Sequence, residues 1–101
     1  MDKVLGMLGM AKRAGRVTSG AFLCGRAVRE GLAQLVIIAK DISENGKKDI
    51  IGLCSHYQVQ YIEYADKLAL GNSIGASERA VVSVNDRKFA DAILAKHASA
   101  Q

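Results

Sequence analysis

The chain has 101 residues, of which half are hydrophobic and 24% are charged, with ten glycines and no proline. This balance excludes a disordered chain and predicts one domain over residues 1–101 with a single hydrophobic core. No apolar run approaches the roughly 18 residues that a membrane span needs, and the start of the chain, Met1-Asp2-Lys3-Val4, does not resemble a secretory signal. We therefore expect a cytoplasmic protein with no membrane partner.

Helices and strands are predicted to alternate along the chain. Small polar residues that can cap a helix precede each helical pattern, and glycines follow most of them. Helices are expected at 2–14 with the cap candidate Asp2, at 20–30 after the cap Ser19, from Asp41 or Ser43 to about His56, at 67–70 after the cap Asp66 and before Gly71, and after Asn85 or Asp86. Strands are expected at 16–18, 34–40, 59–64 and 80–84.

The apolar run Leu35-Val36-Ile37-Ile38-Ala39 is typical of a strand that is buried on both faces. In the helix that follows, Ile50, Cys54 and Tyr57 have the spacing of a buried stripe. Together with the alternation of elements, this predicts an α/β fold, a three-layer α/β/α sandwich with a small four-stranded sheet.

The net charge of +4 is unevenly distributed. Residues 1–40 hold seven lysines and arginines against two acidic residues, a balance of +5, whereas residues 41–101 hold seven against eight, a balance of −1. A basic excess confined to one part of the chain is typical of a surface that binds a polyanion. In a small cytoplasmic domain, we expect that polyanion to be RNA.

The basic residues gather around one turn. Val17-Thr18-Ser19-Gly20 is predicted to carry a short strand into a helix N-terminus, where backbone N–H groups and the helix dipole favour anions. No acidic residue lies between residues 12 and 29. The cationic side chains of this segment are Lys12, Arg13, Arg16, Arg26 and Arg29.

An aromatic ring accompanies these cations. Phe22, Arg26 and Arg29 fall at i, i+4 and i+7 of the second helix, with Gly25 leaving a gap between them. A ring beside two guanidiniums can stack a base and hold its phosphates. The alternative is that Phe22 packs on the first helix and the arginines are simply solvated. The later loop from Ile74 to Arg79 also suits a close approach to a ligand, although an ordinary connection would have the same composition.

Motifs for metals and catalysis are lacking. Cys24 and Cys54 are interpreted as small buried hydrophobic residues, and Cys54 and His56 have no second pair to complete a zinc site. Gly46-Lys47-Lys48 does not fit a phosphate-binding P-loop, and no arrangement of serine, histidine and aspartate can be connected into a triad. We expect no metal, no cofactor, no catalytic residue and no enzymatic activity.

Several segments resemble a known family. They are Leu8-Gly9-Met10-Ala11-Lys12-Arg13-Ala14-Gly15-Arg16-Val17-Thr18-Ser19-Gly20, Arg26-Ala27-Val28, Gly31, and Leu35 through Asn45, and the likeness continues at Cys54, 59–62, Gly71, 74–75 and 78–79. These segments are similar to bacterial YlxQ-type proteins of the kink-turn-binding ribosomal-protein superfamily. The resemblance implies an α/β/α sandwich that binds RNA through the start of the second helix and the loop before the last strand, where Arg79 lies.

Family members that bind kink-turns carry a Gly-x-Asn-Glu-x-x-Lys motif at this helix start. Gly20 matches its glycine and Arg26 its lysine, whereas Phe22 and Leu23 occupy the Asn and Glu positions. In the family, those two polar side chains read the sheared base pairs of the kink-turn, and neither Phe nor Leu can form the same hydrogen bonds. The sequence therefore predicts a basic RNA-binding surface without the pair that reads a kink-turn.

The leading hypothesis is a non-enzymatic, monomeric RNA-binding protein that is associated with the ribosome or with translation. The predicted RNA-binding residues are Lys12, Arg13, Arg16, Gly20, Phe22, Arg26, Arg29 and Arg79. An alternative is a protein-interaction module that has kept the fold, has lost RNA binding and presents Phe22 and Leu23 as an apolar anchor. An enzyme acting on a nucleotide or a phosphorylated metabolite is a third hypothesis.

Overall fold

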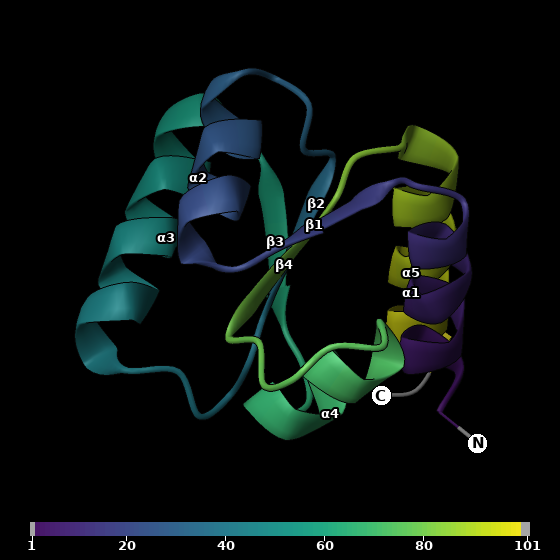
Figure 1. The fold of residues 1–101 in the computed structure, drawn as a ribbon. Coiled ribbons are helices and arrows are strands. Elements are labelled where there is room, and N and C mark those ends of the chain that lie inside the picture. The colour runs from purple at the N-terminus through teal and green to yellow at the C-terminus, as the bar shows by residue number, and fades with distance from the viewer. Residues whose placement is uncertain (1, 100–101) are drawn as a thin grey trace.

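The computed structural model describes residues 2–99, and Figure 1 shows that helices and strands alternate through them. The elements are α1 (Lys3–Arg13), β1 (Val17–Ser19), α2 (Ala21–Arg29), β2 (Leu35–Ile38), α3 (Glu44–Tyr57), β3 (Gln60–Glu63), α4 (Lys67–Ser73), β4 (Val81–Val84) and α5 (Arg87–Ser99). The order of elements and the α/β/α sandwich that the sequence predicts are confirmed. None of the helices within residues 2–99 is long and apolar enough to cross a membrane.

The four strands form one mixed sheet in the order β1-β4-β2-β3. β2 and β3 are parallel, whereas β4 runs antiparallel to both β1 and β2. The last strand in the chain therefore lies beside the first, with Ser19 opposite Val82. The Gly20 N–H continues this pairing by donating to the carbonyl of Val81 at 2.9 Å, so the start of α2 is joined directly to the start of β4.

Helices cover both faces of this sheet. α2 and α3 lie together on one face, α1 and α5 lie on the other, and α4 lies at one end beside α1 (Figure 1). Successive residues of β2 divide between the two cores: Leu35 and Ile37 pack toward α1 and α5, and Val36 and Ile38 pack toward α2 and α3. All four are buried, as the predicted central strand requires.

Three predicted helix caps are confirmed by hydrogen bonds. The carboxylates of Asp2 and Asp66 accept from the N–H groups of Leu5 and Ala69, and the hydroxyl of Ser43 accepts from the Gly46 N–H. Of the two candidates before α3, Ser43 is thus the cap.

Asp41 has a different role, because its carboxylate accepts from the N–H of Lys67 at 2.9 Å. Lys67 is the first residue of α4, so a side chain from the loop after β2 satisfies a donor at the start of a later helix. Asp86, one of the two candidates before α5, is a fourth predicted cap that is confirmed, because its carboxylate accepts from the Phe89 N–H in the first turn of that helix.

Three local predictions are wrong. Ser19 does not cap α2, since it remains in β1 and Gly20 is the N-cap, with a φ of 92° that favours glycine. Gly71 does not end α4, which continues to Ser73. Tyr57 is exposed rather than buried, because it is the last residue of α3 and lies beyond the packed part of that helix.

The two cysteines behave as predicted. Cys24 and Cys54 are both unpaired and fully buried in the core between the sheet and the pair α2 and α3. Removal from water disfavours the thiolate and raises the pKa of each thiol to about 11. Both side chains therefore remain neutral at physiological pH and serve as small hydrophobic residues.

Candidate nucleic-acid interface

The turn from β1 into α2 is open at its N-terminus. Gly20 has no side chain with which to cap the first turn of α2, and no acidic residue lies in that turn. The first N–H groups of a helix lack partners within the helix and carry its partial positive charge. This end of α2 therefore offers backbone donors to an anion, as the sequence predicts.

Two apolar side chains are exposed beside these donors. Phe22 is 76% exposed and Leu23 is 49% exposed, which is unusual for large apolar residues. Phe22 is therefore not packed on α1, and the interpretation that buries it is wrong. Its ring is free to stack on a planar group, and the two residues hold the positions where kink-turn-binding relatives have Asn and Glu.

Arg79 ties the loop before β4 to this turn. Its Nε–H donates to the Ser19 hydroxyl at 3.1 Å, and its Nη1 donates to the Ser77 hydroxyl and the Glu78 carbonyl, both at 2.9 Å. The Arg79 N–H also donates to the Lys67 carbonyl, which holds the loop on α4. The sequence resemblance placed Arg79 near the RNA, but only the structure reveals that its side chain fixes the loop against β1.

Gly71 of α4 allows the loop before β4 to pack closely against that helix. A Cβ at Gly71 would lie 1.9 Å from the carbonyl oxygen of Ser77, so no other residue fits without moving the loop. The loop after α4 runs past the start of α2 on its way to β4 (Figure 1). α4, the loop that contains Arg79 and the start of α2 thus form one surface.

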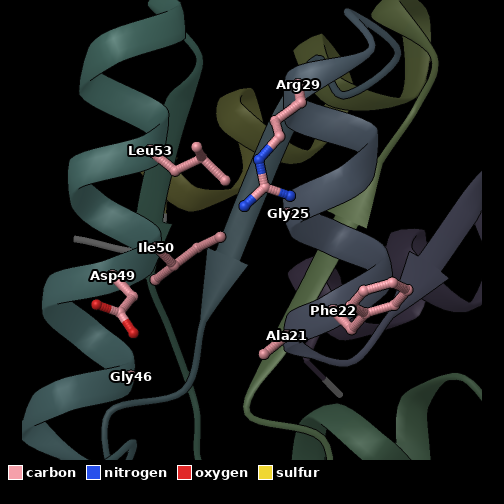
Figure 2. Close-up of a pocket in the computed structure, with 8 residues that line it drawn as sticks. All are labelled: Ala21, Phe22, Gly25, Arg29, Gly46, Asp49, Ile50 and Leu53. Carbon is pink, nitrogen blue, oxygen red and sulfur yellow. The ribbon is translucent and has the colours of Figure 1, made fainter.

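Arg26 and Arg29 differ in their surroundings on α2. Arg26 is exposed and pairs with Glu30 at 3.1 Å, whereas Arg29 points into the cleft between α2 and α3, as Figure 2 shows. Its guanidinium covers Gly25, with Nη1 3.5 Å from the place that a Cβ would take. The gap that the sequence predicts at Gly25 exists, but the side chain of Arg29 occupies part of it.

The three basic residues before the turn are more dispersed. Lys12 and Arg13 are exposed in the last turn of α1, and Arg13 reaches back over Gly9, into a hollow that Ser73 of α4 also lines. Arg16 lies at the opposite end of β1 from Gly20, which at about 3.3 Å per residue is a separation of roughly 13 Å.

Arg16 lines a shallow hollow with Asp86 and Lys88, at the start of α5. The structure therefore brings Gly20, Phe22 and Arg79 together at the start of α2. It places Arg26 and Arg29 along that helix, Arg13 toward α4, and Arg16 away from them.

The comparisons with known proteins agree with this fold. The profile of the Ribosomal protein L7Ae/L30e/S12e/Gadd45 family matches residues 2–94, and the chain belongs to this family. Within the family it is YlxQ-like. It is 38% identical over 88 residues to the RNA-binding protein YlxQ of Bacillus subtilis, covering 87% of this chain and 88% of that protein.

Other relatives extend the likeness. The RNA-binding protein YlxQ of Enterococcus faecium is 33% identical over 89 residues, covering 88% of this chain and 85% of that protein. The large ribosomal subunit protein eL8 of Thermoplasma volcanium is 28% identical over 86 residues, covering 84% of this chain and 71% of that protein.

Solved structures have the same fold. A protein of unknown function from Bacillus halodurans aligns with a TM-score of 0.91 and 32% identity, covering 95% of this chain and 97% of that one. A 15.5 kD RNA-binding protein from Giardia lamblia aligns with a TM-score of 0.80, covering 96% and 83%; at 22% identity it supports the fold alone.

Proposed function

We propose that this protein binds RNA as a monomer in the cytoplasm, in association with the ribosome or with translation. Two YlxQ relatives are named as RNA-binding proteins, and a more distant relative is a large-subunit ribosomal protein. The basic balance of +5 over residues 1–40 supports the same function, because phosphate neutralisation supplies much of the affinity for nucleic acids.

The observation that carries the proposal is the tie between Arg79 and Ser19. It brings the uncapped start of α2, the exposed ring of Phe22 and the loop before β4 into one surface. In this proposal, N–H groups after Gly20 and the guanidiniums of Arg26 and Arg79 bind phosphates, while Phe22 stacks on an unpaired base. Arg29 contacts the RNA from the adjoining cleft between α2 and α3.

The residues farther from Gly20 have a different part in the proposal. Lys12, Arg13 and Arg16 contact phosphates of the flanking RNA, since a strand that follows the start of α2 extends beyond a single turn of helix. Their separation from the turn predicts smaller individual effects on affinity than those of Arg26 and Phe22.

Substitution of exposed residues tests this proposal without disturbing the fold. Phe22→Ala should weaken RNA binding by about 1–3 kcal/mol, because it removes a base stack. Arg26→Ala should weaken it by about 1.5–3 kcal/mol, because it removes a hydrogen bond to a charged phosphate. Lys48→Ala is the matched control, because Lys48 is an exposed cation on α3 and does not line the α2–α3 cleft. Binding measured by fluorescence anisotropy against total bacterial ribosomal RNA fragments should fall for the first two variants only, whereas equal affinities for all three would refute the interface.

The exposure of Phe22 and Leu23 also favours a second candidate, a protein-docking surface with an apolar anchor. The two functions respond differently to salt, since RNA binding loses affinity steeply with ionic strength and an apolar interface does not. The names of the relatives favour RNA.

A further inference from the structure

The cleft between α2 and α3 is a pocket adjoining the proposed interface. It has a volume of about 490 Å³, within the range of small-molecule sites. The lining residues are Ala21, Phe22, Gly25, Arg29, Gly46, Asp49, Ile50 and Leu53. A glycine lines each wall, Gly25 on α2 and Gly46 on α3. Figure 2 shows Ile50 and Leu53 lying between the helices.

Two opposite charges lie on opposite walls of this cleft. Arg29 projects from α2 and Asp49 from α3, and both line the cleft. Figure 2 shows the Arg29 guanidinium between the helices and the Asp49 carboxylate in front of α3. Neither takes part in an ion pair within the described chain, where the paired cations are Arg26, Lys47 and Arg87. The guanidinium of Arg29 and the carboxylate of Asp49 thus line the same cleft as the apolar side chains of Ile50 and Leu53.

A ligand that uses both walls must be flat enough for the cleft and must present donors at one edge and acceptors at another. The carboxylate of Asp49 accepts at two oxygens, and the guanidinium of Arg29 donates from a planar fork. Guanine matches both groups. Its adjacent N1–H and N2–H₂ suit a carboxylate, and its O6 and N7 acceptors suit the bidentate guanidinium pairing that is common in nucleic-acid recognition.

The other bases match less well. Adenine presents an acceptor, N1, beside its N6 amino group, so a carboxylate would meet one donor and one repelling lone pair. Cytosine and uracil each lack the paired O6 and N7 acceptors. The pairing of charges therefore selects guanine among the four bases.

We propose that the α2–α3 cleft is a binding site for a guanine base, held between Arg29 and Asp49 with Phe22 at its rim. This site rests on the proposed RNA-binding function, in which the guanine is an unpaired nucleotide of the bound RNA. Phe22 lines the cleft and is largely exposed, so a base in the cleft and a base stacked on the outer face of Phe22 can belong to one strand.

The direct test compares the full chain's affinities for three seven-nucleotide RNAs of uridine that carry guanosine, adenosine or inosine at the centre. A bidentate contact discriminates by about 1–3 kcal/mol, and ten-fold is 1.4 kcal/mol, so guanosine should bind about ten-fold more tightly than adenosine. Inosine lacks the N2 amino group and should fall between them. Asp49→Asn should abolish the preference by replacing one acceptor with a donor, and Arg29→Lys should reduce it by removing the planar fork.

Asp91→Asn is the matched control, because Asp91 is an exposed acid on α5, far from the cleft in sequence and not among its lining residues. Gly25→Ala is a steric variant that should keep the fold, since its Cβ would meet Leu53 and Arg29 at ordinary contact distances of 3.4 and 3.5 Å while narrowing the cleft. Guanosine preference should survive Asp91→Asn and weaken in Gly25→Ala.

Equal affinity for the guanosine and adenosine RNAs, or a preference that Asp49→Asn leaves unchanged, would overturn the guanine site. If structured RNA still binds in a salt-dependent manner, the proposed function stands without it. A second arm titrates GMP and AMP and follows backbone amide shifts of Ala21 and Gly25 by NMR. If GMP but not AMP shifts these amide signals and the protein binds no RNA, the guanine site is supported and the RNA-binding function is refuted.

Discussion

At the scale of single residues, the interface depends on two glycines, and each position requires glycine for a different physical reason. Gly20 adopts a φ of 92°, which lets the chain leave β1 and enter α2 without a capping side chain over the first N–H groups. Gly71 has no unusual backbone in α4 but leaves room for the Ser77 carbonyl. One glycine opens the anion-binding turn, and the other allows the Arg79 loop to reach it.

Gly71→Ala should destabilise the protein by about 1–3 kcal/mol, the usual cost of forcing atoms into a packed site. The added Cβ would displace the backbone at Ser77 and loosen the Arg79 loop, so RNA affinity should fall as well. Gly52→Ala is the control, since a Cβ there meets nothing within 4 Å and alanine within a helix is favoured by about 0.5–1 kcal/mol. Urea unfolding checks both variants, and a Gly71→Ala protein as stable as wild type would contradict the close approach.

Phe22 and Leu23 determine what kind of RNA the surface can read. We predict little preference for a kink-turn over an RNA of equal length in which Watson–Crick pairs replace the G·A pairs. Apolar side chains at these positions would leave base edges unpaired, at about 1–3 kcal/mol for each group. Phe22→Asn combined with Leu23→Glu should raise the preference, as measured by competition binding. A hundredfold discrimination by the native protein would mean that other residues read the kink-turn.

At the scale of elements, β2 is the centre of the sandwich. Ile37 is fully buried and lies opposite Ile62 on β3 and Val82 on β4, so it contacts both neighbouring strands of the sheet. Ile37→Asp should unfold the domain, because a buried unpaired carboxylate costs several kcal/mol against a total stability of about 5–15 kcal/mol. Gln60→Glu on exposed β3 should leave the thermal midpoint nearly unchanged. An Ile37→Asp protein with a cooperative transition at the wild-type midpoint would show that this strand is not central.

Local patterns were enough to predict most elements. The run Leu35–Ala39 predicts a buried strand because its apolar residues are consecutive, and Ser43 and Asp66 predict helix starts because their side chains accept from N–H groups three residues ahead. Ser19 misled the prediction because a serine before a helix is usually its cap. Here its place in the ladder opposite Val82 prevails, and its hydroxyl accepts from Arg79 instead.

Contacts between distant segments could not be predicted. The strand order places β4 between β1 and β2, and no local pattern encodes that pairing. For the same reason the sequence identified Arg29 but not Asp49, which lines the same cleft only after α2 and α3 pack together.

At the scale of the whole molecule, the basic residues of the N-terminal part of the chain are spread over several surfaces. The basic excess of residues 1–40 is spread from Arg13 beside α4 to Arg16 beside α5, with the start of α2 between the sheet and the Arg79 loop. A field of this breadth steers a long polyanion toward the molecule and aligns it with the few groups that bind closely. The compact contacts at Gly20, Phe22 and Arg79 then define where the RNA is held.

The dependence of RNA affinity on salt tests the central claim most directly. Neutralisation of about 3–5 phosphates should give a slope of about −2 to −4 when the logarithm of the association constant is plotted against the logarithm of salt concentration. Arg13→Ala and Arg26→Ala should each weaken binding and make the slope shallower, with stability changed by no more than about 0.5 kcal/mol. Affinity that does not change with salt, or that neither substitution alters, would contradict an RNA interface at this surface.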